Sequence, residues 1–424
     1  MVQLCLGTMY AWSGFTTKLN HEPYGFSKTR TQVIFSVSLA CWAVGTLLGG
    51  NWQKKAGPRR VTLAGGVVLG AGYLLAGYAG TSFWGILLGI GVAGGIGIGL
   101  AYVCPIAALM KWFPDKKGAI TGRAVAGFGF GALIWIKLTS GFVFGRFNLS
   151  PQWQGLYGAG WGPNEVWRLY GVIFMVLVGL GSLAMVNPPA GWRPAGWHRQ
   201  GKEVLLGSRE FSAREMVGTG PYWILFASFM VAAPAGMMYI GNISLFGVER
   251  LMGAGIARPK AEIIAGTAMG LFYALCNGMG RIIWGGVSER TGRRNAIVLM
   301  CAIQGVMLLA IYRVAGNEVG LYLGSAVIGF NYGGNFVLFA AATSDYFGNR
   351  NVGGNYPLVF IAAGVGGIIG PVLGGMMGDA GLWQWAFLPA GVGCLLVAGL
   401  ALRLKAPETA GKPGISAVSV KTAE

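Results

Sequence analysis

An arginine interrupts an otherwise apolar stretch, FYALCNGMGRIIWGG, at residues 272–286. A charge inside a membrane helix is costly unless it faces the protein interior or a wet path, where it commonly marks a substrate or ion pathway. Guanidinium can bind a carboxylate through two parallel hydrogen bonds, and it stays charged. We therefore expect Arg281 to bind a substrate carboxylate. The alternative is an arginine that reaches the membrane interface or bonds a backbone carbonyl.

Depth and neighbours favour the binding interpretation. Arg281 precedes Glu289 by eight residues, which is roughly 12 Å at about 1.5 Å per helical residue. This approaches the middle of an apolar layer about 30 Å thick. Asn277 lies four residues earlier on the same helix face, where it can orient the guanidinium or donate to a substrate oxygen. Gly278 and Gly280 leave room beside them.

The composition is that of an integral membrane protein. The chain has 424 residues, 54% hydrophobic and 11% charged, with a mean hydropathy of +0.58. Soluble domains carry about a quarter charged residues. The net charge of +18 comes mostly from short gaps between apolar runs, so it does not indicate nucleic-acid binding. The six cysteines lie in apolar runs and there are only two histidines, so we expect no metal site and no cofactor.

Twelve apolar runs approach the length of about 20 residues that a spanning helix needs. The first ends at Lys18 and lacks a basic flank before it, so we expect either a short helix or, preferably, a start that lies upstream of Met1. The sequence thus predicts an all-α membrane protein with twelve transmembrane helices. The runs are 1–17, 31–50, 61–80, 83–110, 119–143, 167–186, 222–241, 262–287, 295–314, 321–342, 357–378 and 384–404.

The runs divide into two sets of six around a polar segment. We expect an N-terminal half at 1–186, a cytoplasmic linker at 187–221, a C-terminal half at 222–404 and a cytoplasmic tail at 405–424. The gaps on the side of this linker hold 21 of the 32 basic residues, and the opposite side holds 9. Because basic loops stay in the cytoplasm, both termini are predicted to lie there, with the protein in the cell membrane.

Two loop motifs recur at similar offsets, which indicates an internal repeat. GNWQKKAGPRR (50–60) corresponds to GGVSERTGRR (285–294), with Gly57 and Gly292 separated by 235 residues. Asp115 in KWFPDKKG and Asp345 in SDYFGNRN are separated by 230 residues. The repeat supports two pseudo-symmetric six-helix halves.

GGVSERTGRR resembles the loop signature of the major facilitator superfamily, which implies that superfamily's fold. The matching residues, to which the resemblance gives a gating role together with the two loop aspartates, are Gly285, Glu289, Arg290, Gly292 and Arg293. The first-half copy departs from the signature, because Lys54 stands where the family usually has an aspartate.

A narrower resemblance covers nearly the whole chain. GTMYAWSGF, LMKWFPDKKGAITG, AVAGFGFGAL and ATSDYFGNRNVGGNYPLVF are similar to motifs of the oxalate/formate antiporter family, which is related to monocarboxylate transporters. This resemblance implies transport of small carboxylates through a central cavity, with Arg281 as the family's helix-8 arginine.

The number of buried cations bears on the substrate. The family's dicarboxylate carrier has a lysine seven residues after the tyrosine that opens helix 11, and here that position is Ala363, after Tyr356. One arginine balances one carboxylate, so we expect a monocarboxylate such as lactate, formate or pyruvate. Lys137 is the other cation within a run, and we expect it to snorkel to the outer interface or, alternatively, to line a vestibule.

Aromatic and amide side chains recur where the family lines its cavity. Any single aromatic residue is more often explained by helix packing, but as a set these residues are expected to converge on Arg281. These residues are Tyr10, Tyr102, Phe128, Asn331, Tyr332, Asn335, Phe336 and Phe360.

The predicted function is secondary transport of a small carboxylate by alternating access, with the bilayer as surroundings and a monomer as the functional unit. Anion exchange and proton symport both stay open; none of the 14 acidic residues is clearly at mid-membrane depth, and Glu262 is the first to test as a proton carrier. Alternatives are an oxalate/formate exchanger, an exporter of larger amphipathic molecules and a sensor with a transporter fold. The runs contain no catalytic constellation and the chain has no P-loop pattern, so an enzyme or an ATP-driven pump is not expected.

Overall fold

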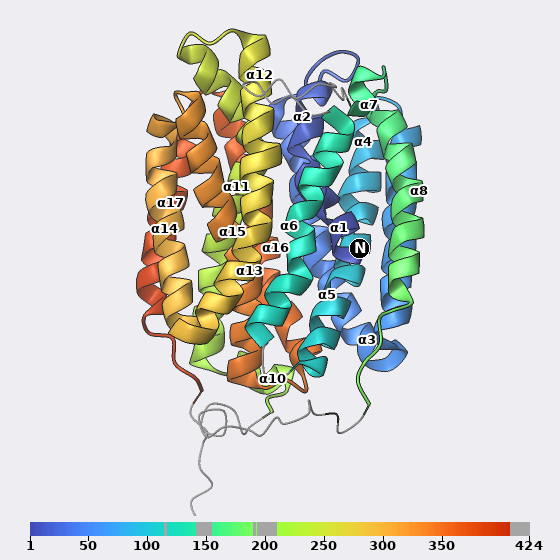
Figure 1. The fold of residues 1–424 in the computed structure, drawn as a ribbon, viewed down its shortest axis with the longest axis vertical. Helices are drawn as coiled ribbons and strands as arrows, with labels where there is room; N and C mark the ends of the chain where they lie inside the picture. Colours follow the sequence, from blue (N-terminus) through green and yellow to red (C-terminus); the bar gives the residue numbers. More distant parts are fainter. Residues whose placement is uncertain (114–116, 141–154, 190–191, 193–209, 408–424) are drawn as a thin grey trace, which may run out of the picture.

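The computed structural model describes residues 1–113, 117–140, 155–189, 192 and 210–407, and every regular element within these ranges is a helix. The long helices run along the longest axis of the molecule (Figure 1). Ten helical stretches are long and apolar enough to cross a membrane. These stretches are Lys28–Tyr78, Phe83–Trp112, Gly118–Thr139, Pro163–Ser182, Gly220–Gly253, Arg258–Thr291, Arg293–Val314, Glu318–Phe347, Val352–Asp379 and Trp383–Ala401.

Each of these stretches consists of one to three helical elements, which are named here as they are labelled in Figure 1. In chain order the elements are α3 (Lys28–Tyr78), α4 (Phe83–Ile86), η2 (Leu87–Gly94), α5 (Gly95–Trp112), α6 (Lys117–Ser140), α8 (Pro163–Ser182), α11 (Gly220–Gly253), α12 (Arg258–Thr267), η3 (Ala268–Tyr273), α13 (Ala274–Thr291), α14 (Arg293–Val314), α15 (Glu318–Phe347), α16 (Val352–Asp379) and α17 (Trp383–Ala401). The short helices α7 (Gly155–Gly158) and α10 (Ala213–Val217) lie at opposite ends of the bundle (Figure 1).

The first predicted run forms three short helices, α1 (Val2–Leu6), η1 (Gly7–Ala11) and α2 (Ser13–Leu19). They pack closely against α6, where a Cβ on Gly7 would lie 2.9 Å from the Cα of Gly131. Tyr10 on η1 is therefore held inside the bundle, with 1% of its surface exposed.

The loop glycines of the repeat share an unusual backbone conformation. Gly57 has φ 79° and ψ 161°, and Gly292 has φ 84° and ψ 152°. Glycine adopts positive φ without the steric cost that other residues bear. Gly57 interrupts α3 within the predicted loop 50–60, and Gly292 separates α13 from α14. The two loops thus turn in the same way. The count of twelve helices and their division into two six-helix halves stay predictions.

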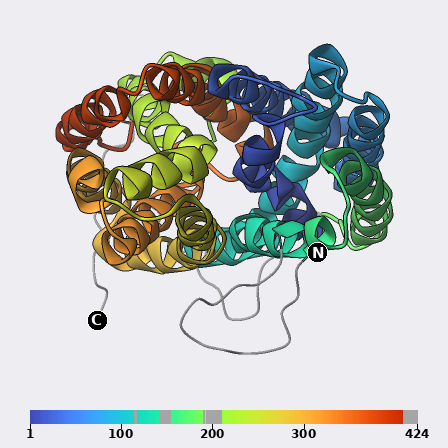
Figure 2. The same cartoon turned by 90° about the horizontal axis from the view of Figure 1, so that it is seen from above.

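The helices are arranged in two groups. Those before residue 183, blue to green, lie on one side, and those after residue 212, yellow-green to red, lie on the other (Figures 1 and 2). We call these the N-terminal and C-terminal groups. They meet along two seams, α3 with α16 and α6 with α13: a Cβ on Gly50 would overlap the Gly353 carbonyl oxygen, and one on Gly122 would overlap that of Arg281. Because glycine has no side chain, contacts at these glycines allow the helix backbones to approach closely.

Candidate functional site

Arg281 lies at the α6–α13 seam and is fully buried, with 0% of its surface exposed. Its Nε donates to Asn277 Oδ1 at 2.9 Å, and its Nη1 donates to the Val125 carbonyl oxygen of α6 at 3.2 Å. Its Nη2 is buried and has no hydrogen-bond partner among the described residues. The guanidinium therefore connects the two groups and keeps one nitrogen available for a ligand.

Asn277 is positioned by its place one helical turn before Arg281, and its side chain is also fully buried. The amide oxygen accepts from Arg281, while the Nδ2 group lies near the Tyr273 hydroxyl without a hydrogen bond of ordinary geometry among the described residues. The acceptor thus orients the guanidinium, as the spacing predicts, and the free donor can reach a second ligand atom.

The two neighbouring glycines admit other helices rather than leaving open space. A Cβ on Gly278 would overlap the Phe130 ring of α6, and one on Gly280 would overlap the Phe330 carbonyl oxygen of α15. Both glycines therefore let α6 and α15 enclose the guanidinium from two sides.

Three aromatic rings face the guanidinium. Its carbon lies 4.8 Å from the ring centroid of Phe336, 5.3 Å from that of Phe128 and 5.9 Å from that of Tyr10. Cation–π attraction within about 6 Å stabilises a buried cation without neutralising it. The rings come from η1, α6 and α15, so both groups contribute.

Tyrosine hydroxyls form a second feature of the site. Tyr332 donates to the Tyr10 hydroxyl at 2.7 Å, which joins the two groups directly. The Tyr102 and Tyr356 side chains interact electrostatically with Arg281 and with each other, and both hydroxyls are buried without a hydrogen bond of ordinary geometry among the described residues.

Trp42 of α3 is central to the cluster, and sequence reasoning missed it. Its ring stacks on Phe128 with centroids 5.0 Å apart and on Phe336 at 5.5 Å, and it meets Phe360 edge-on at 4.8 Å. It also meets Tyr102 edge-on at 5.0 Å. The run that contains it also holds Ser38 and Thr46, four residues before and after Trp42, and this polar face was the signal that distinguished Trp42 from lipid-facing neighbours.

The two predicted asparagines of α15 make contacts elsewhere. Asn335 Nδ2 donates to Gln304 Oε1 of α14 at 3.4 Å, and Asn331 Nδ2 donates to the Val327 carbonyl of its own helix at 2.8 Å. Tyr332 and Phe336, on the adjoining face, contact the Arg281 cluster instead. A one-residue difference in register separates the two faces of α15.

The loop-signature residues gather at the end of the bundle where α10 lies. Glu289 accepts a hydrogen bond from the Ala119 backbone N–H at the start of α6, at 2.8 Å. Arg293 pairs with Asp345 at 2.7 Å and also donates to Ser288. Gly285 packs against the Gly118 carbonyl, Gly292 provides the turn and Arg290 is exposed. Asp115 lies outside the described residues.

In the first-half copy of the repeated loop motif, at 50–60, Lys54 stands where the signature of the superfamily has an acidic residue, and it makes a different contact. Lys54 approaches Gly354, in the first turn of α16, and its Nζ lies 3.5 Å from Asn51 Oδ1. A helix N-terminus carries partial positive charge, so a lysine stabilises it less well than the carboxylate of Glu289 stabilises α6. The two seams therefore differ at this end.

At the opposite end, where α12 lies, ionic contacts join the groups. Lys28 of α3 pairs with Glu249 of α11 and donates to the Gly378 carbonyl at 2.9 Å, and Trp383 Nε1 donates to Glu249 at 2.7 Å. Lys28 and Glu249 border a cavity of about 400 Å³, which is also lined by Glu262 and by Arg258, and the last two pair at 3.0 Å.

Two further features lie apart from Arg281. Lys137 is 8% exposed, and a Cβ on Gly270 would lie 3.1 Å from its Cε. Lys137 therefore packs against η3 rather than reaching outward as snorkelling predicts.

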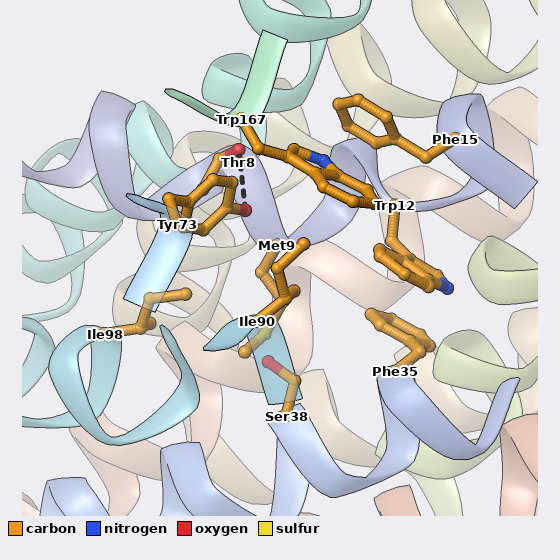
Figure 3. A pocket seen from close by; sticks show the side chains of 10 residues that line it. All are labelled: Thr8, Met9, Trp12, Phe15, Phe35, Ser38, Tyr73, Ile90, Ile98 and Trp167. Atoms are coloured by element: carbon orange, nitrogen blue, oxygen red, sulfur yellow. Dashed lines mark hydrogen bonds between the residues drawn. The ribbon is translucent and has the colours of Figure 1, made fainter. Parts of the chain in front are cut away.

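A second cavity, of about 10 Å³, lies within the N-terminal group, and two of the residues that line it, Thr8 and Tyr73, form a hydrogen bond of 3.1 Å between their hydroxyl groups (Figure 3). It holds at most one water molecule and has no charged lining.

Comparison with known proteins places the chain in a family. The profile of the Major Facilitator Superfamily matches residues 1–315 and 260–423. The oxalate:formate antiporter of Oxalobacter formigenes is 25% identical over 383 residues, covering 90% of this chain and 84% of that protein. Apicoplast pyruvate carrier 1 of Toxoplasma gondii is 27% identical, covering 77% and 66%, and monocarboxylate transporter 13 of Bos taurus is 25% identical, covering 88% and 80%.

These matches, with the apolar helices, confirm the resemblance to the superfamily and a multi-pass membrane location; the particular membrane and the side on which the termini lie stay predictions. The chain belongs to the Major Facilitator Superfamily, whose members are transporters rather than enzymes.

Proposed function

We propose that this protein is a secondary transporter of small carboxylates that works by alternating access, with a monocarboxylate such as lactate, formate or pyruvate as its preferred substrate. The observation that carries the proposal is a buried guanidinium without a counter-ion. Arg281 is fully buried, and none of the buried polar side chains of the described residues is a carboxylate. A buried unpaired charge is costly, so the site favours an anion that arrives from outside.

The number of charges supports the choice of a monocarboxylate. Ala363 of α16, where the dicarboxylate carrier of the resembling family has a lysine, is fully buried. The Arg281 cluster therefore supplies one positive charge for one negative charge. Relatives named as carriers of oxalate and formate, of pyruvate and of monocarboxylates support the carboxylate class.

The test is uptake of labelled lactate, formate and oxalate into vesicles that contain the purified protein. Stimulation by unlabelled anion inside indicates exchange, whereas stimulation by an inward proton gradient indicates symport. Binding of a carboxylate without flux of any anion supports a sensor instead. Oxalate uptake that exceeds uptake of every monocarboxylate contradicts the charge argument.

Arg281→Lys tests the binding group. Lysine keeps the charge but cannot make paired hydrogen bonds in one plane, so we expect uptake to fall by at least about tenfold. Arg168→Lys is the matched control, because Arg168 pairs with Glu165 on the partly exposed face of α8. Unchanged uptake in Arg281→Lys means that the guanidinium does not bind the substrate.

A further inference from the structure

The buried polar atoms around Arg281 that lack partners are mainly donors. Five such atoms belong to the described side chains that meet Arg281 or the aromatic rings around it, and two of the five, the Tyr102 and Tyr356 hydroxyls, also interact with each other. The five atoms are Arg281 Nη2, Asn277 Nδ2, Trp42 Nε1, Tyr102 Oη and Tyr356 Oη. The three nitrogens only donate, and a tyrosine hydroxyl donates or accepts. A buried donor without an acceptor carries a free-energy penalty, so this set favours a ligand that brings several acceptor oxygens.

These donors form two sets on different helices. Arg281 and Asn277 lie one turn apart on α13, and together they suit the two oxygens of a carboxylate. Trp42, Tyr102 and Tyr356 come from α3, α5 and α16, and their rings are connected. Trp42 and Tyr102 are 5.0 Å apart by centroid, and Phe360 lies 5.6 Å from Tyr102 and 5.7 Å from Tyr356.

The two sets are close enough for one small molecule to contact both. The Tyr102 and Tyr356 side chains interact electrostatically with Arg281, and the Trp42 ring stacks on Phe128 and Phe336, which both face the guanidinium. All five side chains with unpartnered atoms are at least 99% buried. A substrate with few heavy atoms is therefore required.

We propose that Trp42, Tyr102 and Tyr356 form a second subsite, which binds an acceptor oxygen on the carbon next to the substrate carboxylate, so that the preferred substrates are 2-oxo acids. This inference rests on the proposed carboxylate function and deepens it. A 2-oxo acid such as pyruvate brings three acceptor oxygens, one negative charge and no donor.

Related acids fit this set of donors less well. Propionate has the same chain length but lacks the third oxygen, so the second subsite stays unpaired. Lactate has that oxygen, but its hydroxyl proton must be accepted by the Tyr102 or Tyr356 hydroxyl, which then orients its lone pair rather than its proton toward the substrate. Oxalate places a second negative charge among neutral donors. The expected order of affinity is pyruvate, then lactate, then propionate, with oxalate below pyruvate.

The experiment is calorimetric titration of the purified full-length protein with pyruvate, lactate, propionate and oxalate. One hydrogen bond to the third oxygen makes pyruvate about tenfold tighter than propionate. Tyr102→Phe and Tyr356→Phe should each lower this pyruvate-to-propionate ratio severalfold, because they remove only a hydroxyl that contacts the third oxygen. Trp42→Phe should do the same and keeps an aromatic ring in the stack.

Tyr73→Phe is the matched control. Tyr73 is also a buried tyrosine, but its hydroxyl bonds Thr8 inside the N-terminal group. Its removal should leave the ratio unchanged. Equal affinity for pyruvate and propionate in the unmodified protein, or a ratio that none of the three variants alters, overturns the second subsite and leaves the carboxylate carrier intact. Failure of every carboxylate to bind overturns the proposed function and this inference with it.

Discussion

Among the described residues, the partners of the Arg281 guanidinium are neutral: an amide oxygen, a backbone carbonyl and three aromatic rings. These partners fix its orientation and leave its charge uncompensated. A carboxylate in place of the Asn277 amide would change this balance without changing the size of the side chain. The amide is therefore as important for anion binding as the arginine it orients.

Asn277→Asp should weaken binding of a monocarboxylate by at least about tenfold, because the new carboxylate forms an ion pair with Arg281 and competes with the substrate. Affinity measured by calorimetry checks this expectation. Asn295→Asp, on the exposed first turn of α14, is the control for the added charge. Equal affinity in Asn277→Asp and the unmodified protein would show that the substrate does not contact Arg281.

At the scale of elements, α13 is positioned by glycines that let α6 and α15 approach its backbone. Each of these contacts places the α13 backbone directly against a neighbouring helix and leaves no space for a methyl group. A Cβ on Gly286, in the same helix, would meet no atom within 4 Å. The helix therefore offers a packed and an unpacked glycine for direct comparison.

Gly280→Ala should destabilise the fold by about 1–3 kcal/mol, because its Cβ would overlap the Phe330 carbonyl oxygen. Gly286→Ala should be neutral or stabilise the helix by up to about 1 kcal/mol, since alanine has the higher helix propensity. Thermal unfolding of the two variants in detergent distinguishes them. Equal melting temperatures would mean that the α13–α15 contact is looser than the structure indicates.

At the scale of the whole molecule, contacts between the two groups exist at both ends. Glu289 binds the first turn of α6 at the α10 end, and Lys28 pairs with Glu249 at the α12 end. Arg281 between them is inaccessible to solvent. The proposed alternating access therefore requires one set of these contacts to open before a substrate can reach Arg281.

Lys28→Cys combined with Glu249→Cys tests this requirement. A short reversible cross-linker between the two cysteines should abolish uptake, and reduction should restore it, because the α12 end can no longer open. The background must first lose its six natural cysteines, which are all free thiols. Glu165→Cys with Arg168→Cys, both on α8, is the control pair. Full uptake by the cross-linked Lys28–Glu249 pair would show that this end need not separate.

Much of the site follows from local sequence. Spacing of four residues places Asn277 beside Arg281, and Tyr10, Phe128 and Phe336 occur in motifs that predicted aromatic residues near the arginine. Trp42 was not predicted, although Ser38 and Thr46, one turn before and after it, indicate that this face of the helix is turned away from lipid. Asn335 was placed at the cavity, yet it bonds Gln304, because the rotation of α15 about its axis depends on packing against α14.

The sequence by itself determined the class of the protein, the membrane helices and the presence of one arginine at membrane depth with an amide one turn away. These features depend on composition and on spacing within a single helix, which local chemistry sets. Only the tertiary structure decided which atoms remain without partners: Arg281 Nη2, Asn277 Nδ2, the Trp42 indole and two tyrosine hydroxyls. They lie on four helices, so their convergence depends on the close contacts along the two seams, which no single segment of sequence encodes.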